Sequence, residues 1–387
     1  MRELNPVLQT FRDSPFTQMT LRALELGAVN LGQGFPDHAP PAFVQEALQQ
    51  SFTGPQQYVP VAGLLSLREE LARDAKKRLG LNLDAATEVT ITAGATEAVQ
   101  SALQGILQPG DEVVILEPTY DMYAPQVKLA GGVPVFVPLK FEGSYVLDAE
   151  GLKSALSEKT RVIILNTPHN PTGKVFTKAE LQAIAALAIQ HDLYVISDEV
   201  YDRLTYGAAH TCIHTLEGMQ DRTITVGSAG KTFAVTGWRV GWAFASAALS
   251  KAIRGVHQWV SFCAPSPLQQ ATMLALKTAQ TFDYSASVQQ DYVQKRDFLS
   301  SALQEAGFPI SRPEGGYFVV ADVSHMGMTE QQACDWMLKV VGVASIPMGV
   351  FYDQGVSPFA GLRFAFCKGQ ETLEQAAERL YAGCKVL

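Results

Sequence analysis

The residue best suited to chemistry in this sequence is a lysine that follows a short glycine-containing loop. Lys231 lies in the stretch VGSAGKT, residues 226–232, which invites comparison with a phosphate-binding loop. The nucleotide-binding loop needs four residues between its glycines, so that enough backbone amides surround the phosphates. Only two residues separate Gly227 from Gly230 here. A triphosphate site is therefore excluded, and the role of the lysine needs another explanation.

A second role for Lys231 is that of a nucleophilic amine. A lysine condenses with an aldehyde only in its neutral form, and its ordinary pKa of about 10.4 leaves little neutral amine at pH 7. The condensed product has a lower pKa, and Arg239 in TGWRVGW could lower it further and contact an anion as well. An isolated lysine is more often a solvated surface residue, so this hypothesis depends on its neighbours.

A candidate anion site follows the apolar run VTIT. In AGATEA, Gly94 lets the chain turn, and the amides of Ala95 and Thr96 lie at the start of a predicted helix. Free amides at the positive end of a helix suit a single phosphate, which Ser228 could also contact. Taken alone, a tight turn with Thr96 as helix cap explains the stretch equally well.

Two further polar clusters follow later apolar runs. NTPHNPTG carries Asn166 and Asn170, whose amides can point into a cleft, and DEVYDRL places Asp198 and Tyr201 after LYVIS. An unpaired carboxylate at the end of a buried strand is costly, so Asp198 needs a cationic partner. A protonated pyridine nitrogen would be such a partner, and so would an arginine.

The elements that carry these clusters alternate in type. The apolar runs VTIT, EVVIL, VIILN, LYVIS and TITVG are separated by amphipathic stretches such as residues 96–107 and 178–190, a pattern typical of a mostly parallel α/β sheet. In such sheets ligands bind outside the carboxyl ends of the strands, where all four clusters fall. The last ninety or so residues instead mix strands with helices near 329–341 and 371–382, which predicts a small α+β unit.

Taken together, the phosphate loop, NPTG, the strand-end Asp with Tyr, and S-x-x-K followed by GWRVG resemble the fold type I, class I/II aminotransferases, which depend on pyridoxal phosphate. The resemblance covers nearly the whole chain and is strongest to the kynurenine, glutamine and methionine aminotransferase subgroup. It implies a large domain with a mostly parallel seven-stranded sheet at 46–285, a small domain at 286–387, and an N-terminal segment, 1–45, beside the small domain.

The resemblance also implies roles for single residues. Lys231 would bind the cofactor covalently and shuttle the proton, Asp198 would pair with the pyridine nitrogen, and Asn170 and Tyr201 would bond the ring hydroxyl. The remaining cofactor contacts would come from phosphate ligands and from a ring that stacks on the cofactor: Gly94, Ala95, Thr96, Ser228 and Arg239, Tyr58 of the neighbouring subunit, and Tyr120.

For the substrate, the resemblance implies Arg363 in GLRFAFC as the ligand of the α-carboxylate, with Asn170 beside it and Gly34 in the segment that closes over the site. Phe16 and Phe262 would line the side-chain pocket, Phe262 from the neighbouring subunit. Phe16 and Cys263 stand where some kynurenine aminotransferases carry Trp and His, which disfavours kynurenine as the main substrate, and WVSFCAPSPLQQ lacks an arginine for aspartate.

The expected reaction is therefore ping-pong transfer of the α-amino group from methionine, glutamine, phenylalanine, tyrosine or kynurenine to an α-keto acid. A cysteine-conjugate β-lyase of the same fold, which uses the same lysine and ring, stays open as an alternative. A nicotinamide-dependent oxidoreductase would need G-x-G-x-x-G after an early strand, and the sequence has none. Non-catalytic regulators of this fold carry a DNA-binding module ahead of the aminotransferase-like region, and this chain starts almost at that region.

Composition excludes other classes. The net charge of −8 provides no basic surface for nucleic acid or for a membrane. Five scattered cysteines, none in a C-x-x-C pair, indicate neither a disulfide framework nor a metal site. The N-terminus lacks the apolar core of a signal peptide and no long apolar span follows, so we expect a cytoplasmic protein. The resemblance adds a homodimer with shared active sites.

Overall fold

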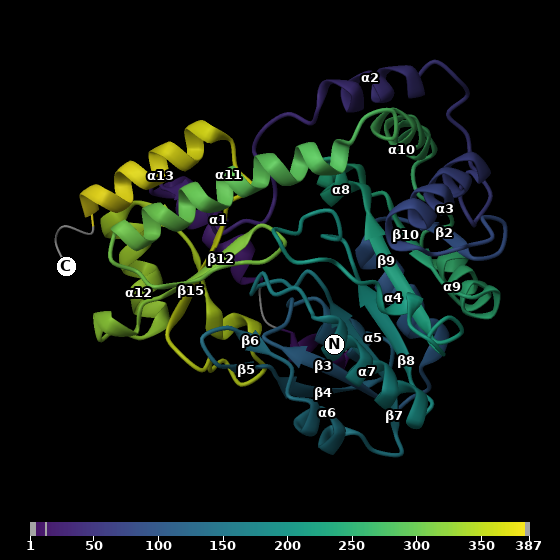
Figure 1. Cartoon of the computed structure of the whole chain (residues 1–387), viewed down its shortest axis with the longest axis horizontal. Helices are drawn as coiled ribbons and strands as arrows, with labels where there is room; N and C mark the ends of the chain where they lie inside the picture. The colour runs from purple at the N-terminus through teal and green to yellow at the C-terminus, as the bar shows by residue number, and fades with distance from the viewer. Residues whose placement is uncertain (1–4, 12–13, 384–387) are drawn as a thin grey trace, which may run out of the picture.

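The computed structural model describes residues 5–11 and 14–383 and divides into a large unit and a small unit (Figure 1). The large unit is built on a seven-stranded sheet in the order β2-β10-β9-β8-β7-β3-β4. β10 runs antiparallel to both of its neighbours, whereas the other pairs are parallel. The bounds of these strands are Val89–Thr92 (β2), Glu112–Glu117 (β3), Val133–Pro138 (β4), Thr160–Asn166 (β7), Tyr194–Asp198 (β8), Thr223–Ser228 (β9) and Gly241–Phe244 (β10).

Helices cover both faces of this sheet. Val162 and Ile164 of β7 pack in the cluster that contains α4, α5 and α9, whereas Ile163 and Leu165 face α6 and α7. Because both faces are buried, the strands are continuous apolar runs. The helices of the large unit are Ala42–Ser51 (α2), Leu65–Leu79 (α3), Ala95–Ile106 (α4), Tyr123–Leu129 (α5), Ala149–Ala155 (α6), Lys178–Gln190 (α7), Ala229–Thr232 (α8), Ala247–Val260 (α9) and Ser266–Ala279 (α10). A short hairpin pairs Lys140–Phe141 (β5) with Tyr145–Val146 (β6).

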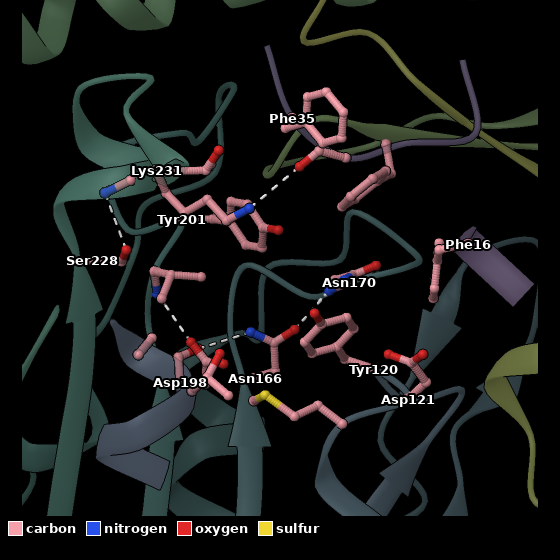
Figure 2. Close-up of a pocket in the computed structure, with 18 of the residues that line it drawn as sticks. Phe16, Phe35, Tyr120, Asp121, Asn166, Asn170, Asp198, Tyr201, Ser228 and Lys231 are labelled. Carbon is pink, nitrogen blue, oxygen red and sulfur yellow. Dashed lines mark hydrogen bonds between the residues drawn. The ribbon is translucent and has the colours of Figure 1, made fainter. Parts of the chain in front are cut away.

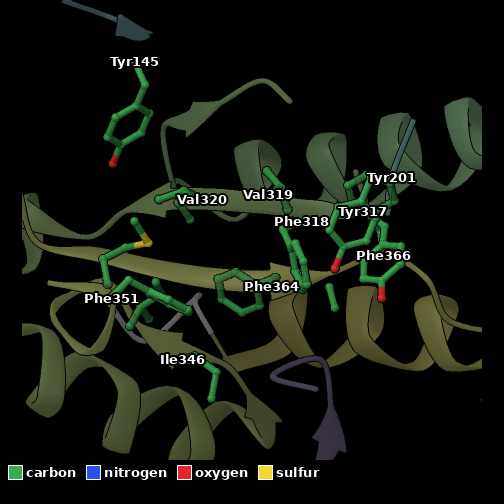
Figure 3. Close-up of a cluster of buried hydrophobic side chains, with 14 of the residues drawn as sticks. Tyr145, Tyr201, Tyr317, Phe318, Val319, Val320, Ile346, Phe351, Phe364 and Phe366 are labelled. Atoms are coloured by element: carbon green, nitrogen blue, oxygen red, sulfur yellow. The ribbon is translucent and has the colours of Figure 1, made fainter. Parts of the chain in front are cut away.

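The small unit is an antiparallel sheet in the order β11-β12-β15-β14, with helices packed around it. Its strands are Ile310–Ser311 (β11), Phe318–Asp322 (β12), Ile346–Pro347 (β14) and Gly361–Ala365 (β15), and its helices are Tyr284–Glu305 (α11), Glu330–Trp336 (α12) and Gln370–Gly383 (α13). Aromatic side chains from β12, β15 and the turns beside them fill its core (Figure 3). A π-helical turn, Met337–Val341, and five 3₁₀ turns complete the described elements: Pro6–Thr10, Ile213–Thr215, Thr236–Trp238, Ser324–Met326 and Met348–Phe351.

The N-terminal segment packs on the small unit. Val29–Asn30 (β1) pairs in parallel with Val343–Ala344 (β13), and α1 (Pro15–Glu25) packs beside the same strand. The domain limits expected from the sequence, 1–45, 46–285 and 286–387, stay a prediction. Within residues 5–11 and 14–383, no helix is both long and apolar enough to cross a bilayer.

The α/β architecture and the mostly parallel seven-stranded sheet are confirmed. Two local details differ from the sequence interpretation. The alternative interpretation, in which Thr96 caps the helix, is wrong: Gly94 is the N-cap of α4, and its φ of 82° favours glycine. The stretch that follows Arg239 forms an additional strand, β10, between β2 and β9.

Candidate active site

A cavity of about 340 Å³ lies where the carboxyl ends of the large sheet face the small unit and the N-terminal segment (Figure 2). Its position agrees with the rule that open α/β sheets bind ligands outside these strand ends. Twelve of the residues predicted for the site line it: Phe16, Gly34, Ala95, Thr96, Tyr120, Asn170, Asp198, Tyr201, Ser228, Lys231, Arg239 and Arg363. Of the three others, Gly94 adjoins the lining and two lie elsewhere.

One end of the cavity is formed by the N-terminus of α4. A Cβ atom on Gly94 would lie 2.4 Å from Nη2 of Arg239, so only glycine lets the guanidinium approach this turn. A Cβ on Gly241 would meet the amide nitrogen of Ala95 at the same distance, 2.4 Å. Ser228, at the end of β9, accepts a hydrogen bond from the Gly230 amide at 3.1 Å. The two glycines leave free a compact cradle of amides, a hydroxyl and a cation, which suits a phosphate.

Asp198 lies at the floor of the cavity, at the end of β8, and is only 5% exposed. Tyr123 donates a hydrogen bond of 2.7 Å to its Oδ2, and the Val200 amide contacts its Oδ1 at 3.3 Å. Burial raises the pKa of the Asp198 carboxyl, while the Tyr123 hydroxyl and the charge on Lys231 act in the opposite direction. A cation inside the cavity would stabilise the carboxylate.

The two asparagines of NTPHNPTG have different roles. Asn166 bridges the backbone, because its Nδ2 donates to the Asp198 carbonyl at 2.9 Å and its Oδ1 accepts from the Asn170 amide at 2.7 Å. Asn170 accepts a 2.9 Å hydrogen bond from Arg363, which has donors only, through Oδ1. Its NH₂ group is therefore free to donate into the cavity, as the sequence interpretation requires.

Lys231 reaches into the cavity from α8. Its Nζ donates to Tyr317 Oη at 2.7 Å and lies 3.3 Å from the carbonyl oxygen of Gly34. Burial lowers the pKa of the Lys231 amine to about 8, and the positive charges of Arg239 and Arg363 act in the same direction. About one tenth of the amine is then neutral at pH 7. The nucleophilic role considered in the sequence analysis needs a usable fraction of neutral amine, and the lowered pKa provides it.

Arg363 is buried at the opposite end of the cavity and is 1% exposed. Its guanidinium packs against the rings of three phenylalanines and donates to the Gly32 carbonyl at 2.8 Å, but it forms no salt bridge with any described residue. Its buried Nε finds no hydrogen-bond partner within residues 5–11 and 14–383. Burial lowers the pKa of this guanidinium to about 10. Asp121 acts on this charge without forming a salt bridge with it. A buried cation without a directly paired anion is unfavourable, so this end of the cavity suits a carboxylate.

Tyr58 and Phe262 do not line this cavity. They are 83% and 42% exposed, and their rings form an edge-to-face pair with centroids 5.3 Å apart on the surface. Phe262 has a φ of 67°, which is unusual for a bulky residue. The prediction that both serve a neighbouring subunit needs a second chain and stays a prediction.

Among the residues that sequence reasoning missed, three contribute polar groups to the site. Tyr123 bonds Asp198, Tyr317 bonds Lys231, and Asp121 adds a carboxylate to the lining. Tyr123 follows Tyr120 by three residues in TYDMY, and Tyr317 follows two glycines at the start of a predicted strand. These patterns could have marked both tyrosines as candidates, but not their partners.

The fold and the site together define a pyridoxal-phosphate enzyme of fold type I. The residues present fit that cofactor: a phosphate cradle, a buried carboxylate for the ring nitrogen and a lysine of lowered pKa lie around one cavity. The chain matches the family model of class I and II aminotransferases over residues 27–380 and belongs to that family.

Similar proteins are named as aminotransferases or transaminases. The chain is 40% identical over 389 residues to a probable N-succinyldiaminopimelate aminotransferase of Mycobacterium tuberculosis, and the match covers 96% of each. It is 37% identical to a kynurenine–oxoglutarate transaminase of Dictyostelium discoideum, covering 96% of this chain and 94% of that one. The structure of YbdL from Escherichia coli, described as having a methionine aminotransferase function, superposes with a TM-score of 0.95 at 36% identity, covering 99% and 100%. The protein is thus an aminotransferase, and the β-lyase alternative is not supported.

Proposed function

We propose that this aminotransferase takes the α-amino group from neutral or aromatic amino acids and passes it to an α-keto acid. The observation that carries the proposal is the makeup of the cavity beside Arg363. Phe16 and Tyr120 line it, and the one unassigned charge is the carboxylate of Asp121. An aromatic lining favours apolar side chains, and a carboxylate repels a second acidic group on the substrate.

The residues divide the work as follows. The cofactor, when bound, withdraws electrons from the α-carbon of the substrate. Asp198, which is buried and bonded to Tyr123, keeps the proton on the ring nitrogen. Lys231 takes and returns the proton of the α-carbon as its neutral amine. Arg363 holds the α-carboxylate by two parallel hydrogen bonds, while Asn170 and Tyr201 orient the ring by its hydroxyl.

A panel of amino donors tests this proposal. The pure holoenzyme is mixed with methionine, glutamine, phenylalanine, tyrosine, kynurenine and aspartate, and the cofactor absorbance reports the half-reaction for each. We expect neutral and aromatic donors to react at least tenfold faster than aspartate. N-succinyldiaminopimelate belongs in the panel because of the relative from Mycobacterium tuberculosis, and a clear preference for it or for aspartate would contradict the proposal. Pyruvate and ammonia released from a cysteine conjugate without any keto acid would reveal lyase side activity.

We further propose a homodimer in which Tyr58 and Phe262 complete the partner's site. An exposed aromatic pair, one member of which has a strained backbone, supports a contact surface, and two-fold pairing is the commonest closed assembly. Light scattering tests the assembly, and an active monomer would exclude it. Mixing a Tyr58→Phe chain with a Lys231→Ala chain tests the shared site, because both lesions fall in one site of the heterodimer and leave the other intact. We expect recovered activity that neither parent shows, provided that Tyr58→Phe alone is impaired.

We also propose the domain limits given above and a cytoplasmic location. The pairing of β1 with β13 supports an N-terminal segment beside the small unit, and α11, which begins at Tyr284, supports the limit at 285. The limit at 45 falls within α2, which packs on α10 of the large unit. The location is supported by the N-terminal sequence, and fractionation of cells that express the protein tests it.

A further inference from the structure

Two oxygen atoms from distant parts of the chain hold the Lys231 amine. Nζ lies 2.7 Å from Tyr317 Oη and 3.3 Å from the Gly34 carbonyl oxygen, and Figure 2 draws the second contact beside Phe35. Tyr317 Oη lies 2.6 Å from the same carbonyl. The three groups form a closed triangle that joins the large unit, the small unit and the N-terminal segment.

The protons in this triangle can be assigned by elimination. A carbonyl oxygen has no proton, so the 2.6 Å contact between Tyr317 and Gly34 contains the tyrosine proton. With its proton engaged, the Tyr317 oxygen can only accept from Lys231, and any hydrogen bond with the neighbouring Tyr201 hydroxyl must likewise be donated to it. The Gly34 carbonyl can also only accept from Lys231. The lysine uses two N–H bonds on these acceptors. A neutral amine has two N–H bonds and one lone pair, so its lone pair stays free of the triangle.

Tyr317 is fixed firmly enough to define this geometry. The residue is 1% exposed, and its ring stacks on Tyr292 with centroids 6.2 Å apart. It also meets the ring of Tyr201 edge-on, with centroids 4.9 Å apart, and Figure 3 shows these two tyrosines side by side. Burial raises the pKa of the Tyr317 hydroxyl well above its usual value, so the phenol keeps its proton at neutral pH. The Tyr317 hydroxyl therefore keeps one position and one protonation state, and can fix the position of the flexible Lys231 amine.

Gly34 is equally constrained. A Cβ atom there would lie 2.6 Å from Cζ of Phe318, so a larger residue would push the segment and its carbonyl away from the lysine. Phe318 also packs under Arg363, with the guanidinium carbon 4.0 Å from the ring centroid. The Phe318 ring therefore contacts both Gly34 of the triangle and Arg363, the proposed ligand of the substrate carboxylate.

We propose that Tyr317 and the Gly34 carbonyl form a receiving site for the Lys231 amine when the amine is not joined to the cofactor. Tyr317 is then a positioning residue: it directs the free lone pair of the neutral amine toward the cavity, where the proton of the α-carbon must be taken up. This inference rests on the proposed role of Lys231. It adds a reason why the released amine stays oriented and does not sample the many conformations of a lysine side chain.

The test replaces Tyr317 by phenylalanine, which removes the hydroxyl and keeps the packed ring. Residue-specific labelling of the cofactor-free full chain with acetic anhydride across pH, followed by mass spectrometry of the peptide that contains Lys231, gives the apparent pKa of this amine. The hydroxyl accepts a hydrogen bond that favours the charged lysine, so we expect the pKa in Tyr317→Phe to fall by about half a unit to one unit. Tyr292→Phe is the matched control, because its ring packs on Tyr317, and it should leave the pKa unchanged.

A second readout addresses orientation. In the holoenzyme we expect Tyr317→Phe to slow the half-reaction about tenfold, with a larger rate difference between α-deuterated and ordinary substrate and little change in KM. Identical lysine pKa and identical isotope effect in Tyr317→Phe and wild type would overturn the proposal, and so would equal changes in Tyr292→Phe. Borohydride fixation of the cofactor distinguishes failure of the proposed lysine role from failure of the receiving site. If the wild type carries no label on Lys231, the proposed role of the lysine is refuted. If Lys231 is labelled but Tyr317→Phe changes neither the lysine pKa nor the isotope effect, only the receiving site is refuted.

Discussion

Two arginines stand at opposite ends of the cavity and are held in opposite ways. Arg239 is exposed and lies in the left-handed region at a φ of 53°. In the part of the chain that the structure describes, it donates to the Thr236 and Ala93 carbonyls, at 3.2 and 3.4 Å. Arg363 is 1% exposed, packs on three phenylalanine rings and contacts Asn170. The phosphate end is therefore made by backbone groups and a solvent-facing charge, whereas the carboxylate end is made by the packing of buried side chains.

This difference sets what each arginine can contribute. An exposed charge is screened by water and salt and shares its anion with the helix N-terminus, so its loss is partly compensated. A buried guanidinium without an anionic partner interacts strongly with the one carboxylate that enters. We expect substrate selection to depend steeply on Arg363 and cofactor retention to depend only moderately on Arg239.

The largest effect is expected from Arg363→Met, which keeps much of the side-chain volume and removes the charge. The second-order rate constant of the half-reaction with methionine or phenylalanine should fall by about 10²–10³-fold, because a desolvated charge pair contributes roughly 3–4 kcal/mol. Cofactor affinity should change less than threefold. Stopped-flow absorbance measures the rate, and a loss below fivefold would show that the α-carboxylate binds elsewhere.

A smaller effect is expected from Arg239→Met. The dissociation constant of the cofactor should rise about tenfold, since one exposed charge-assisted contact contributes on the order of 1–2 kcal/mol. At saturating cofactor, the half-reaction should stay within threefold of wild type. Fluorescence titration of the cofactor-free protein measures the affinity. A loss of half-reaction rate as large as that in Arg363→Met would show that the two arginines do not differ in their contributions.

The smallest effect concerns Lys231, which lies between the two arginines. Only its neutral amine reacts with the cofactor, and its pKa is lowered from 10.5 to about 8, so covalent capture should speed up with pH below 8 and level off above it. Because both arginines lower this pKa, each methionine variant should move the midpoint upward, by at most about half a unit. Capture rates across pH measure the midpoint, and a wild-type midpoint near 10 would contradict the burial of the amine.

The same contrast explains what the sequence could predict. Gly94, Asp198 and Lys231 stand directly after apolar strands, so local pattern and the rule for strand ends were enough to bring them together. The additional strand β10 was missed because GWAF is short and follows a turn that resembles a loop.

Contacts across the fold could not be predicted. Tyr317 lies 86 residues from Lys231 and Tyr123 lies 75 residues from Asp198, and only tertiary packing decides that these hydroxyls meet those side chains. Of the two asparagines, only Asn170 was predicted as a ligand contact, and the backbone geometry gives the reason. Asn166 bridges the backbone through both ends of its amide, whereas Asn170 accepts from Arg363 through Oδ1 and keeps its NH₂ group for the cavity. The partner contacts of Tyr58 and Phe262 depend on a second chain.

Every role proposed for the cavity depends on Lys231 being the lysine that binds the cofactor covalently. The holoenzyme is reduced with borohydride and digested, and the peptides are sequenced by mass spectrometry. The cofactor mass should be found on Lys231, whose amine faces the cavity and forms no salt bridge with any described residue. The contrasting lysine is Lys174, which is 8% exposed and pairs with Glu180 at 2.8 Å. Cofactor mass on Lys174, with none on Lys231, would contradict the account.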